Sequence, residues 1–387
     1  MQPLAAIQAS AFPRPLSAGA VAGRLEAFLS VARDVPGEYW TAEHFLADRP
    51  GKWEFSRAIF DPADPEKVLA YAFASRPEPS LVHLHHLMVA CDHRGRGLGR
   101  QLLTELSHRA ALAGAAHLRL KVHPANQRAA AFYLREGFQV VGEENGYKVM
   151  TSPVRLLQRR VGIHQPNFLP WLGYFYKMAR ADCFVFADSL AFSKRSYTQR
   201  VQIKTAGGPQ WLTAPILHTG YVGQVIRDVR CGGSPNWRQQ LVKAIKGNYL
   251  QCPYYRRYGP AIDAILMSGE DRLAELNMQL IKYIAGELEI RTPLVTSSEM
   301  KLPPKDDPTE WIISVCKEVG ATVFLSGRGG ANYQDESAYG RGGIKLVYTD
   351  FQHPTYLQAF GDFVPGLSIV DALFNVGPAA INLLEYR

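Results

Sequence analysis

Apolar and polar residues recur at two different spacings along the first half of the chain, and each change of spacing marks a new element. An apolar run over residues 81–89 predicts a strand, and the helical spacing of apolar side chains from residue 101 onward predicts a helix. Between them lies His93-Arg94-Gly95-Arg96-Gly97-Leu98-Gly99-Arg100, a turn rich in glycine and arginine. The same spacings predict an edge strand at 3–12, strands at 53–60, 68–74, 117–122 and 140–150, and helices at 21–31 and 41–46. Glu144-Asn145-Gly146 predicts a turn within the last strand.

A second pattern begins at Val161, after a linker at residues 151–160. Residues 161–188 predict a strand, a helix and a buried strand, and a basic loop follows at 192–200. Such a crossover belongs to an α/β sheet, whose ligands bind at the carboxyl ends of the strands. The remaining predicted elements are a helical region at 235–290, a helix at 309–319 and a strand at 321–325. We therefore expect two domains, at residues 1–157 and 161–387.

Composition narrows the classes to which the chain can belong. The 387 residues are 47% hydrophobic and 20% charged, which is ordinary for globular domains. There is no long apolar run and no signal-peptide pattern at the N-terminus, so we expect a cytoplasmic protein without a membrane span. The five cysteines lack zinc-type spacing, and we expect no metal site. A net charge of +8 favours an anionic partner, such as a nucleotide, a carrier protein or tRNA.

The turn at residues 93–100 has the composition of an anion site. Glycines let a ligand approach the backbone closely, and the unpaired N–H groups of a helix N-terminus point at it. Arg94, Arg96 and Arg100 add positive charge, so pyrophosphate is the expected ligand. The alternative is a plain turn capped by glycines. The glycine spacing fits neither the Rossmann fingerprint nor a P-loop.

A second motif follows the predicted strand at 117–122 and consists of Asn126, Phe132-Tyr133 and Gly137-Phe138. Together with Arg94-x-x-Gly97-x-Gly99, it resembles the GNAT acyltransferase superfamily over roughly residues 1–155. The resemblance implies an α+β domain with a mixed central sheet, whose loop binds the pyrophosphate of acetyl-CoA or another acyl-CoA. The cofactor-binding residues that it implies are Met88, Val89, Arg94, Gly95, Arg96, Gly97, Leu98, Gly99, Arg100 and Asn126.

Two residues are candidates for proton transfer, because such an enzyme deprotonates an ammonium and then reprotonates the thiolate of CoA. His83 and His85 share one face of the predicted strand, and His85 stands about where many family members place a carboxylate base. The intrinsic pKa of histidine suits this role. Tyr133 matches the tyrosine that protonates the thiolate. Alternatively, His83 and His85 are only polar residues near a cleft, and Tyr133 only packs against its neighbours.

The second domain closely resembles the WbqC-like family of bacterial proteins from about residue 161 to 382. The motifs that carry the resemblance are His164-Gln165-Pro166-Asn167, Pro170-Trp171-Leu172-Gly173-Tyr174-Phe175, Ser193-Lys194-Arg195-Ser196, Trp211-Leu212-Thr213, and the segments 325–333, 352–356 and 367–371. Gln199 stands where asparagine is more usual, and Leu190-Ala191 replaces a more polar pair. The resemblance implies an α/β domain with a mainly parallel sheet and a setting in polysaccharide or specialised-metabolite biosynthesis, without defining a reaction.

Polar groups at the predicted carboxyl ends of strands form the candidate site of this domain. His164 and Asp188 are candidates for an acid–base pair, or for residues that only orient a ligand. We expect an anionic ligand, bound by residues that include Gln165, Asn167, Lys194, Arg195, Arg200, Ser326, Gly327, Gly329, Gly330 and His353. The segment 168–174 also resembles the signature of nucleotidyltransferases and class I synthetases. Trp171 and Tyr174 replace its two histidines, which favours a retained nucleotide-shaped pocket over adenylate transfer.

Three functions agree with this organisation. The first is an acyl-CoA-dependent N-acyltransferase that forms an amide on an amino sugar nucleotide or an amino-acid intermediate, with the second domain binding or modifying the amine or acting in an adjacent step. In the second, the WbqC-like domain itself forms an amide or N-linked bond from a nucleotide-activated or tRNA-borne aminoacyl donor. The third is a carrier- or RNA-binding module fused to a degenerate GNAT fold, and the intact glycine loop argues against it. We favour the first.

Overall fold

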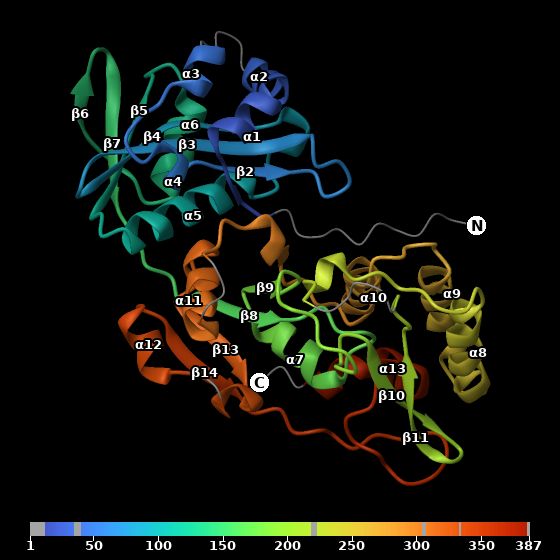
Figure 1. Cartoon of the computed structure of the whole chain (residues 1–387). Helices are drawn as coiled ribbons and strands as arrows, with labels where there is room; N and C mark the ends of the chain where they lie inside the picture. The colour runs from blue at the N-terminus through green and yellow to red at the C-terminus, as the bar shows by residue number, and fades with distance from the viewer. Residues whose placement is uncertain (1–11, 35–39, 218–222, 304–306, 333, 385–387) are drawn as a thin grey trace. The chain divides into compact units, whose positions relative to one another are not determined.

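The computed structural model describes residues 12–34, 40–217, 223–303, 307–332 and 334–384. The chain forms two compact units, Met1–Leu157 and Gln158–Arg387, which are described separately below (Figure 1). The edge strand expected at 3–12 lies outside the described residues, apart from Phe12.

The first unit is built on a seven-stranded mixed sheet with the order β1-β2-β3-β4-β5-β7-β6. Only β4 and β5 pair in parallel, and every other neighbouring pair is antiparallel. The strands are β1 (Arg14–Pro15), β2 (Arg57–Phe60), β3 (Val68–Glu78), β4 (Leu81–Val89), β5 (His117–Val122), β6 (Gln139–Glu144) and β7 (Tyr147–Pro153). The mixed sheet confirms the α+β class predicted for this part of the chain.

Helices cover both faces of this sheet, because its central strands carry apolar side chains on both sides. Phe28, Tyr71 and Phe73 belong to one core, and Leu69, Leu102 and Leu120 to another. The helices are α1 (Ala18–Gly23), α2 (Leu25–Arg33), α3 (Ala42–Leu46), α4 (Lys52–Phe55), α5 (Leu98–Leu112) and α6 (Gln127–Arg135), with a 3-10 turn η1 (Cys91–His93).

Three sequence predictions in this unit are wrong in detail. The last strand, predicted at 140–150, is a hairpin of β6 and β7 that reverses at residues 145–146. The helix predicted at 21–31 is two helices that meet at Arg24. The strand predicted at 53–60 begins only at Arg57, because residues 52–55 form the short helix α4. The buried Lys52 ammonium donates hydrogen bonds to the carbonyls of Phe45 and Ala47, and these bonds hold α4 against the end of α3.

The parallel pair β4 and β5 separates partway along its length, and we call this opening the strand split. The two strands pair from Leu81 with His117 up to Leu84 with Leu120. Against β3, Phe73 pairs with His86 and Ala74 with Leu84, so His85 is the extra residue of a β-bulge. Beyond the bulge β4 continues to Val89, and no further pairing with β5 occurs among the described residues. The carboxyl half of β4 therefore has one edge open to a ligand.

The second unit contains a five-stranded sheet with the order β12-β9-β8-β13-β14, in which every pair is parallel. The strands are β8 (Arg160–His164), β9 (Cys183–Phe186), β12 (Leu294–Thr296), β13 (Val323–Gly327) and β14 (Lys345–Thr349). A separate antiparallel hairpin consists of β10 (Arg200–Thr205) and β11 (Gly208–Thr213). The mainly parallel α/β sheet confirms the fold class predicted for this half.

Two further cores flank the parallel sheet. Helices α8, α9, α10 and α13 share one core with α7, and α11 and α12 cover the other face. The helices are α7 (Leu172–Arg180), α8 (Trp237–Tyr249), α9 (Tyr255–Leu266), α10 (Leu273–Glu287), α11 (Pro308–Glu318), α12 (Glu336–Arg341) and α13 (Ile369–Val376). The 3-10 turns are η2 (Ile226–Asp228), η3 (Ser297–Glu299), η4 (Arg328–Asn332) and η5 (Gly377–Leu384). Within the described part of the chain, no helix combines the length and the apolar character that a membrane crossing requires.

Candidate functional site

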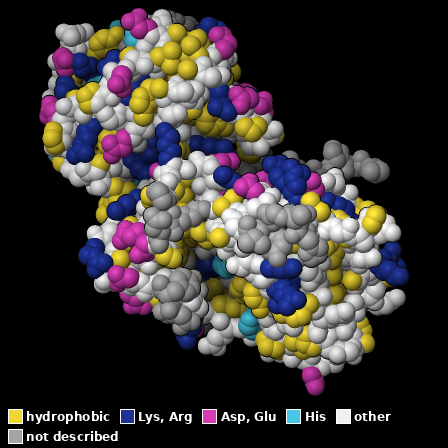
Figure 2. Space-filling model, viewed as in Figure 1, with side chains coloured by type: hydrophobic (Ala, Val, Ile, Leu, Met, Phe, Trp, Pro, Cys, Tyr) yellow, Lys and Arg dark blue, Asp and Glu magenta, His cyan; other side chains and the backbone are white. Residues whose placement is uncertain are grey.

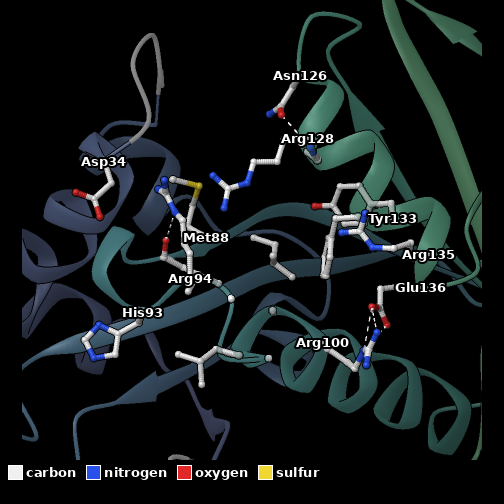
Figure 3. A pocket seen from close by; sticks show the side chains of 18 residues that line it. Asp34, Met88, His93, Arg94, Arg100, Asn126, Arg128, Tyr133, Arg135 and Glu136 are labelled. Carbon is white, nitrogen blue, oxygen red and sulfur yellow. Dashed lines mark hydrogen bonds and ion pairs between the residues drawn. The ribbon is translucent and has the colours of Figure 1, made fainter.

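A cavity of about 630 Å³ opens beside the strand split and is called the first cavity (Figure 3). Its walls come from the end of β4, the glycine-rich turn, the start of α5 and one side of α6. The lining residues are Asp34, Leu87, Met88, Val89, His93, Arg94, Gly95, Gly97, Leu98, Gly99, Arg100, Asn126, Arg128, Ala129, Phe132, Tyr133, Arg135 and Glu136. Of the predicted cofactor-binding residues, all except Arg96 line it, and the exposed Arg96 side chain does not.

Glycine is required at the turn for two different reasons. Gly95 and Gly97 have φ values of +80° and +81°, a conformation that L side chains rarely adopt. Gly97 is also the N-cap of α5. The first helical turn begins at the cavity, so its unpaired N–H groups are available to a ligand there. At Gly99 a Cβ would lie 3.3 Å from the Phe132 ring, so the small residue permits close packing of α5 against α6.

The first cavity has an excess of positive charge. Four arginines line it, Arg94, Arg100, Arg128 and Arg135, against the carboxylates of Asp34 and Glu136. Glu136 pairs with Arg100 at 2.9 Å, and the Nε of Arg94 donates to the carbonyl of Val89 at 3.0 Å. The donors and the helix N-terminus therefore fit a pyrophosphate group, which is the part of CoA that the glycine turn was predicted to bind.

Helix α6 positions the two remaining predicted residues of this cavity. Asn126 is its N-cap, and its Oδ1 accepts a hydrogen bond from the Ala129 N–H at 3.0 Å. Tyr133 lies seven residues, about two helical turns, after Asn126, with its ring against Phe132 and Phe138. Figure 3 shows its hydroxyl pointing into the cavity. Burial raises the pKa of Tyr133 well above its ordinary value, so the hydroxyl keeps its proton at neutral pH.

A second cavity of about 860 Å³ lies along the other half of β4. Its lining residues are Trp40, His44, Arg49, Pro50, Ser75, Pro77, His83, Leu84, His85, Arg119, Lys121, Glu144, Asn145 and Tyr147. The predicted base His85 therefore faces the second cavity and does not line the first. The bulge at His85 stands between the two cavities along β4.

Of the three histidines of β4, His83 and His85 lie together, as the alternation of the strand predicted. Their rings are 4.6 Å apart, and the Nε2 of His85 is 2.7 Å from the Oγ of Ser75. Burial, followed by the charge of Arg119, lowers the pKa of His83 to about 4. Burial, followed by the neighbouring His83, lowers the pKa of His85 to about 3. Both imidazoles are therefore neutral at neutral pH and can accept hydrogen bonds.

In the second unit, the chain order of the strands defines where a ligand would bind. Strand β8 is central, and the chain proceeds outward first through β9 and β12 and then, on the other side, through β13 and β14. The switch point of such a doubly wound sheet lies outside the carboxyl ends of the two strands where the direction reverses, here β8 and β13. His164 ends β8 and Gly327 ends β13, and the pairing of Gly162 with Leu325 places these ends side by side.

Aromatic and basic groups surround His164. Its ring lies 4.8 Å from that of Tyr174 and 5.8 Å from that of Trp171, and its Nδ1 is 3.2 Å from the Gln165 carbonyl oxygen. Burial, followed by the charge of Lys177, places the pKa of His164 well below its ordinary value. Burial also lowers the pKa of Lys177 to about 7, and its Nζ donates to the Ile163 carbonyl at 3.0 Å. Figure 2 shows histidine side chains at a hollow in the surface of the second unit.

The structure assigns other contacts to several residues predicted for this site. Asp188 is buried, and it accepts hydrogen bonds from the hydroxyls of Ser297 and Ser298 and from the Ser298 N–H. These bonds join the segment after β9 to η3 and anchor Asp188 there, and its acid–base pairing with His164 stays a prediction. The Oε1 of Gln165 accepts from the Thr198 hydroxyl at 3.1 Å.

The other predicted residues are distributed around the same end of the unit. Asn167 is buried, Lys194 and Arg195 are exposed, and Arg200 lies over the Trp211 ring at 4.1 Å. Ser326 is buried at the end of β13, and Gly329 and Gly330 belong to η4 directly after it. His353 follows β14, with its ring 4.9 Å from that of Phe351. A Cβ on Gly173 would lie 2.8 Å from both Phe351 and Trp171, so the segment after β14 packs beside the start of α7.

Sequence reasoning missed several residues that line the two cavities. Arg128 and Arg135 supply two of the four arginines of the first cavity. Arg128 could have been found from the sequence, because it stands two positions after Asn126, the N-cap of α6. Arg49 and Trp40 line the second cavity from the segment between α2 and α4, for which no motif was available. Among the described residues, no group of three or more His, Cys, Asp or Glu side chains is placed to hold a metal ion.

The mixed sheet with its strand split, the glycine-rich turn at the N-terminus of α5 and the basic cavity between them define an acyltransferase-type domain. The acetyltransferase (GNAT) family model matches residues 25–138, so the chain carries a GNAT domain. The WbqC-like protein family model matches residues 165–383, more than half of the chain. The protein belongs to the WbqC-like protein family.

Similar proteins are known for each half. Uncharacterized protein Rv1507c of Mycobacterium tuberculosis (strain ATCC 25618 / H37Rv) is 32% identical over 230 residues, which are 59% of this chain and 98% of that protein. The ribosomal-protein-S18-alanine N-acetyltransferase of Escherichia coli is 21% identical over 38% of this chain and 94% of its own, with a TM-score of 0.32. The PaiA N-acetyltransferase of Thermoplasma acidophilum, solved in complex with coenzyme A, is 18% identical over 37% of this chain and 99% of its own, with a TM-score of 0.30.

Proposed function

We propose that the first unit is an N-acyltransferase that transfers the acyl group of acetyl-CoA, or of another acyl-CoA, to a small amine. The observation that carries this proposal is the first cavity, where the glycine-rich turn and Tyr133 meet at the strand split of a GNAT domain. The bound acyl-CoA supplies a thioester, whose carbonyl carbon forms the new C–N bond as the C–S bond breaks.

Two side chains carry out the proton transfers of this proposal, His85 in the second cavity and Tyr133 in the first. In this proposal the amine approaches from the second cavity, and the neutral His85 accepts its proton and passes it to solvent. A pKa of about 3 makes His85 a weak base, well below the value near the operating pH that suits a general base, so this role requires that the cavity also lower the pKa of the bound ammonium group. Tyr133 holds its proton until the thiolate departs and then donates it to the sulfur. The glycine-rich turn and the arginines of the first cavity hold the pyrophosphate.

The acceptor of the proposed reaction is a small biosynthetic amine. We propose an amino sugar nucleotide or an amino-acid intermediate of a polysaccharide or specialised metabolite, made in the cytoplasm. The support is the fusion of a GNAT domain to a WbqC-like domain. An amine presented on a carrier protein or on tRNA is the alternative, and an acceptor panel distinguishes these sources.

The proposal is tested on the full chain with acyl-CoA titrations by calorimetry and with thiol release from acetyl-CoA in the presence of an amine panel. We expect CoA to bind with a stoichiometry of one per chain and a subset of amines to release the thiol, with the amide identified by mass spectrometry. A folded chain that binds no CoA contradicts the proposal.

We also propose a second site, in which the WbqC-like unit binds a phosphorylated or otherwise anionic ligand at the switch point between β8 and β13. The specific support is the strand order, in which β8 and β13 pair up to Gly162 and Leu325, shortly before His164 and Gly327 end the two strands. Nucleotides and sugar nucleotides are titrated into the wild-type chain and His164→Ala, with His117→Ala, an exposed histidine of the first unit, as the control. Thermal shifts that His164→Ala leaves unchanged contradict this site.

A further inference from the structure

The second cavity contains more cations than its single carboxylate can neutralise. Glu144 forms two ion pairs: its Oε2 lies 2.5 Å from Arg119, and its Oε1 lies 2.6 Å from Lys121. Arg49 lines the same cavity, is exposed, and has no ion-pair partner in the described part of the chain. Three cations therefore share one carboxylate, and the cavity has a net charge of +2.

The other polar groups of the second cavity leave this charge unbalanced. His83 and His85 are neutral at neutral pH, and the cations themselves contribute to the lowered pKa of His83. The Nε of Arg119 is buried and has no hydrogen-bond partner among the described residues. Strand β5 and the β6–β7 turn hold Arg119, Lys121 and Glu144 in register, because Lys121 pairs with Val149 and Glu144 with Tyr147.

From this arrangement we propose that the second cavity takes an amine that also carries a phosphate or carboxylate group, and that Arg49, Arg119 and Lys121 hold that anionic group. This proposal rests on the proposed acyl transfer and names the chemical class of its acceptor. Arginine grips phosphate and carboxylate through two parallel hydrogen bonds, and lysine adds a mobile positive charge.

The positive charge has a second effect on such an acceptor. A nearby cation disfavours another positive charge, so the cavity lowers the pKa of an ammonium group bound within it. The amine is then neutral, and thus nucleophilic, in a larger fraction of the complexes. The anionic group offsets the repulsion for the molecule as a whole, while a simple amine without that group is bound poorly.

The test compares matched amines on the full chain, with binding measured by ligand-observed NMR in the presence and absence of CoA. The phosphate pair is glucosamine 6-phosphate and glucosamine, and the carboxylate pair is leucine and leucinamide. The variants are Lys121→Glu and Arg49→Glu, each of which reduces the net charge of the cavity from +2 to 0. Arg33→Glu is the control, because this exposed residue of α2 makes the same change in total charge and lines neither cavity.

We expect the anionic member of at least one pair to bind roughly 10–100-fold more tightly than its neutral partner, as for a charge-assisted contact. Lys121→Glu and Arg49→Glu abolish that preference, and Arg33→Glu retains it. The pair that shows the preference identifies phosphate or carboxylate as the group recognised. Equal binding within both pairs, no binding of either anionic amine, or tighter binding of the neutral amines overturns the proposal. Failure of CoA to bind, with the anionic preference intact, instead overturns the acyl transfer and leaves this site standing.

Discussion

Tyr133 and Gly97 have different proposed roles in the first cavity, one as a proton donor and the other as a gap for a phosphate. The tyrosine is fixed by packing against Phe132 and Phe138, and its buried hydroxyl has a raised pKa. The glycine contributes no side chain, and its backbone conformation presents the start of α5. One residue would supply a proton and the other would clear space for a phosphate, so their substitution affects different steps.

Replacing Tyr133 by phenylalanine removes the hydroxyl and keeps the ring packing. If this hydroxyl protonates the leaving thiolate, kcat falls by roughly 10²–10⁴-fold, the usual contribution of one positioned proton donor. The affinity for CoA stays close to that of the wild type, because the pyrophosphate contacts lie elsewhere in the cavity. Steady-state and single-turnover rates measure the effect, and an unchanged single-turnover rate rules out the role.

Gly97→Ala tests the backbone approach to the pyrophosphate. Gly114 is a matched control, because it also has a positive φ, +78° against +81°, and an added Cβ would meet no atom within 4 Å at either position. We expect both variants to lose about 1–2 kcal/mol of stability from the left-handed backbone. Only Gly97→Ala should also lose CoA affinity, by roughly tenfold or more. Equal CoA affinities in the two variants by calorimetry contradict the predicted phosphate site.

At the scale of elements, sequence periodicity identified the segments that carry the candidate chemistry. The strand at 81–89, the helix after the glycine-rich turn and the α/β crossover that begins at Val161 all occur as predicted. Helix α4 was mistaken for strand because its apolar residues also suit a strand, and the deciding interactions, from Lys52 to the carbonyls of Phe45 and Ala47, involve residues outside the segment. Local pattern cannot contain such information.

The site was predictable to the extent that its residues belong to motifs. The glycine-rich turn, Asn126 and Tyr133 were found because they are close in sequence or in recognisable order, and apart from Arg96 they line one cavity. The bulge at His85 was not predictable, since it depends on the register between β3 and β4. The capture of Asp188 by Ser297 and Ser298 joins residues more than a hundred positions apart, which no spacing rule reveals.

Helix α7 and strand β8 enclose a lysine whose titration can be measured. Burial lowers the pKa of Lys177 from 10.5 to about 7, so between these values the unfolded chain binds a proton that the folded chain has released. Stability contributed by this residue therefore rises with pH from about 7 toward 10.5. Relative to Lys177→Met, the wild type should gain up to about 1.4 kcal/mol per pH unit across this window. Urea unfolding of both chains at several pH values measures the difference, and a difference independent of pH contradicts the prediction.

At the scale of the whole molecule, each sheet is assembled from one continuous part of the chain. The last strand of the first sheet ends at Pro153, and the first strand of the second sheet begins at Arg160. Each unit also has its own hydrophobic cores. Two units of this kind can respond separately to ligands, because a ligand stabilises only the folded body to which it binds.

Differential scanning calorimetry should therefore show two transitions for the full chain. We expect CoA at 100 times its Kd to stabilise one transition by about 2.7 kcal/mol at 25 °C and to leave the other unmoved. Gly97→Ala weakens that response, whereas Gly114→Ala keeps it. A single transition that CoA shifts as a whole contradicts separate unfolding of the two units.

The separation of the two sheets along the chain has a consequence for synthesis on the ribosome. Strand β7 is the next-to-last strand of its sheet in space but the last in sequence, and it inserts between β5 and β6. The first sheet thus stays open until residue 153 has emerged, with the exposed edge of β5 available to other nascent chains. Once β7 is in place, no later segment is needed to close that sheet, and the second unit can be made beside a finished neighbour. A pause in synthesis after β7 has left the ribosome would therefore give this strand time to dock.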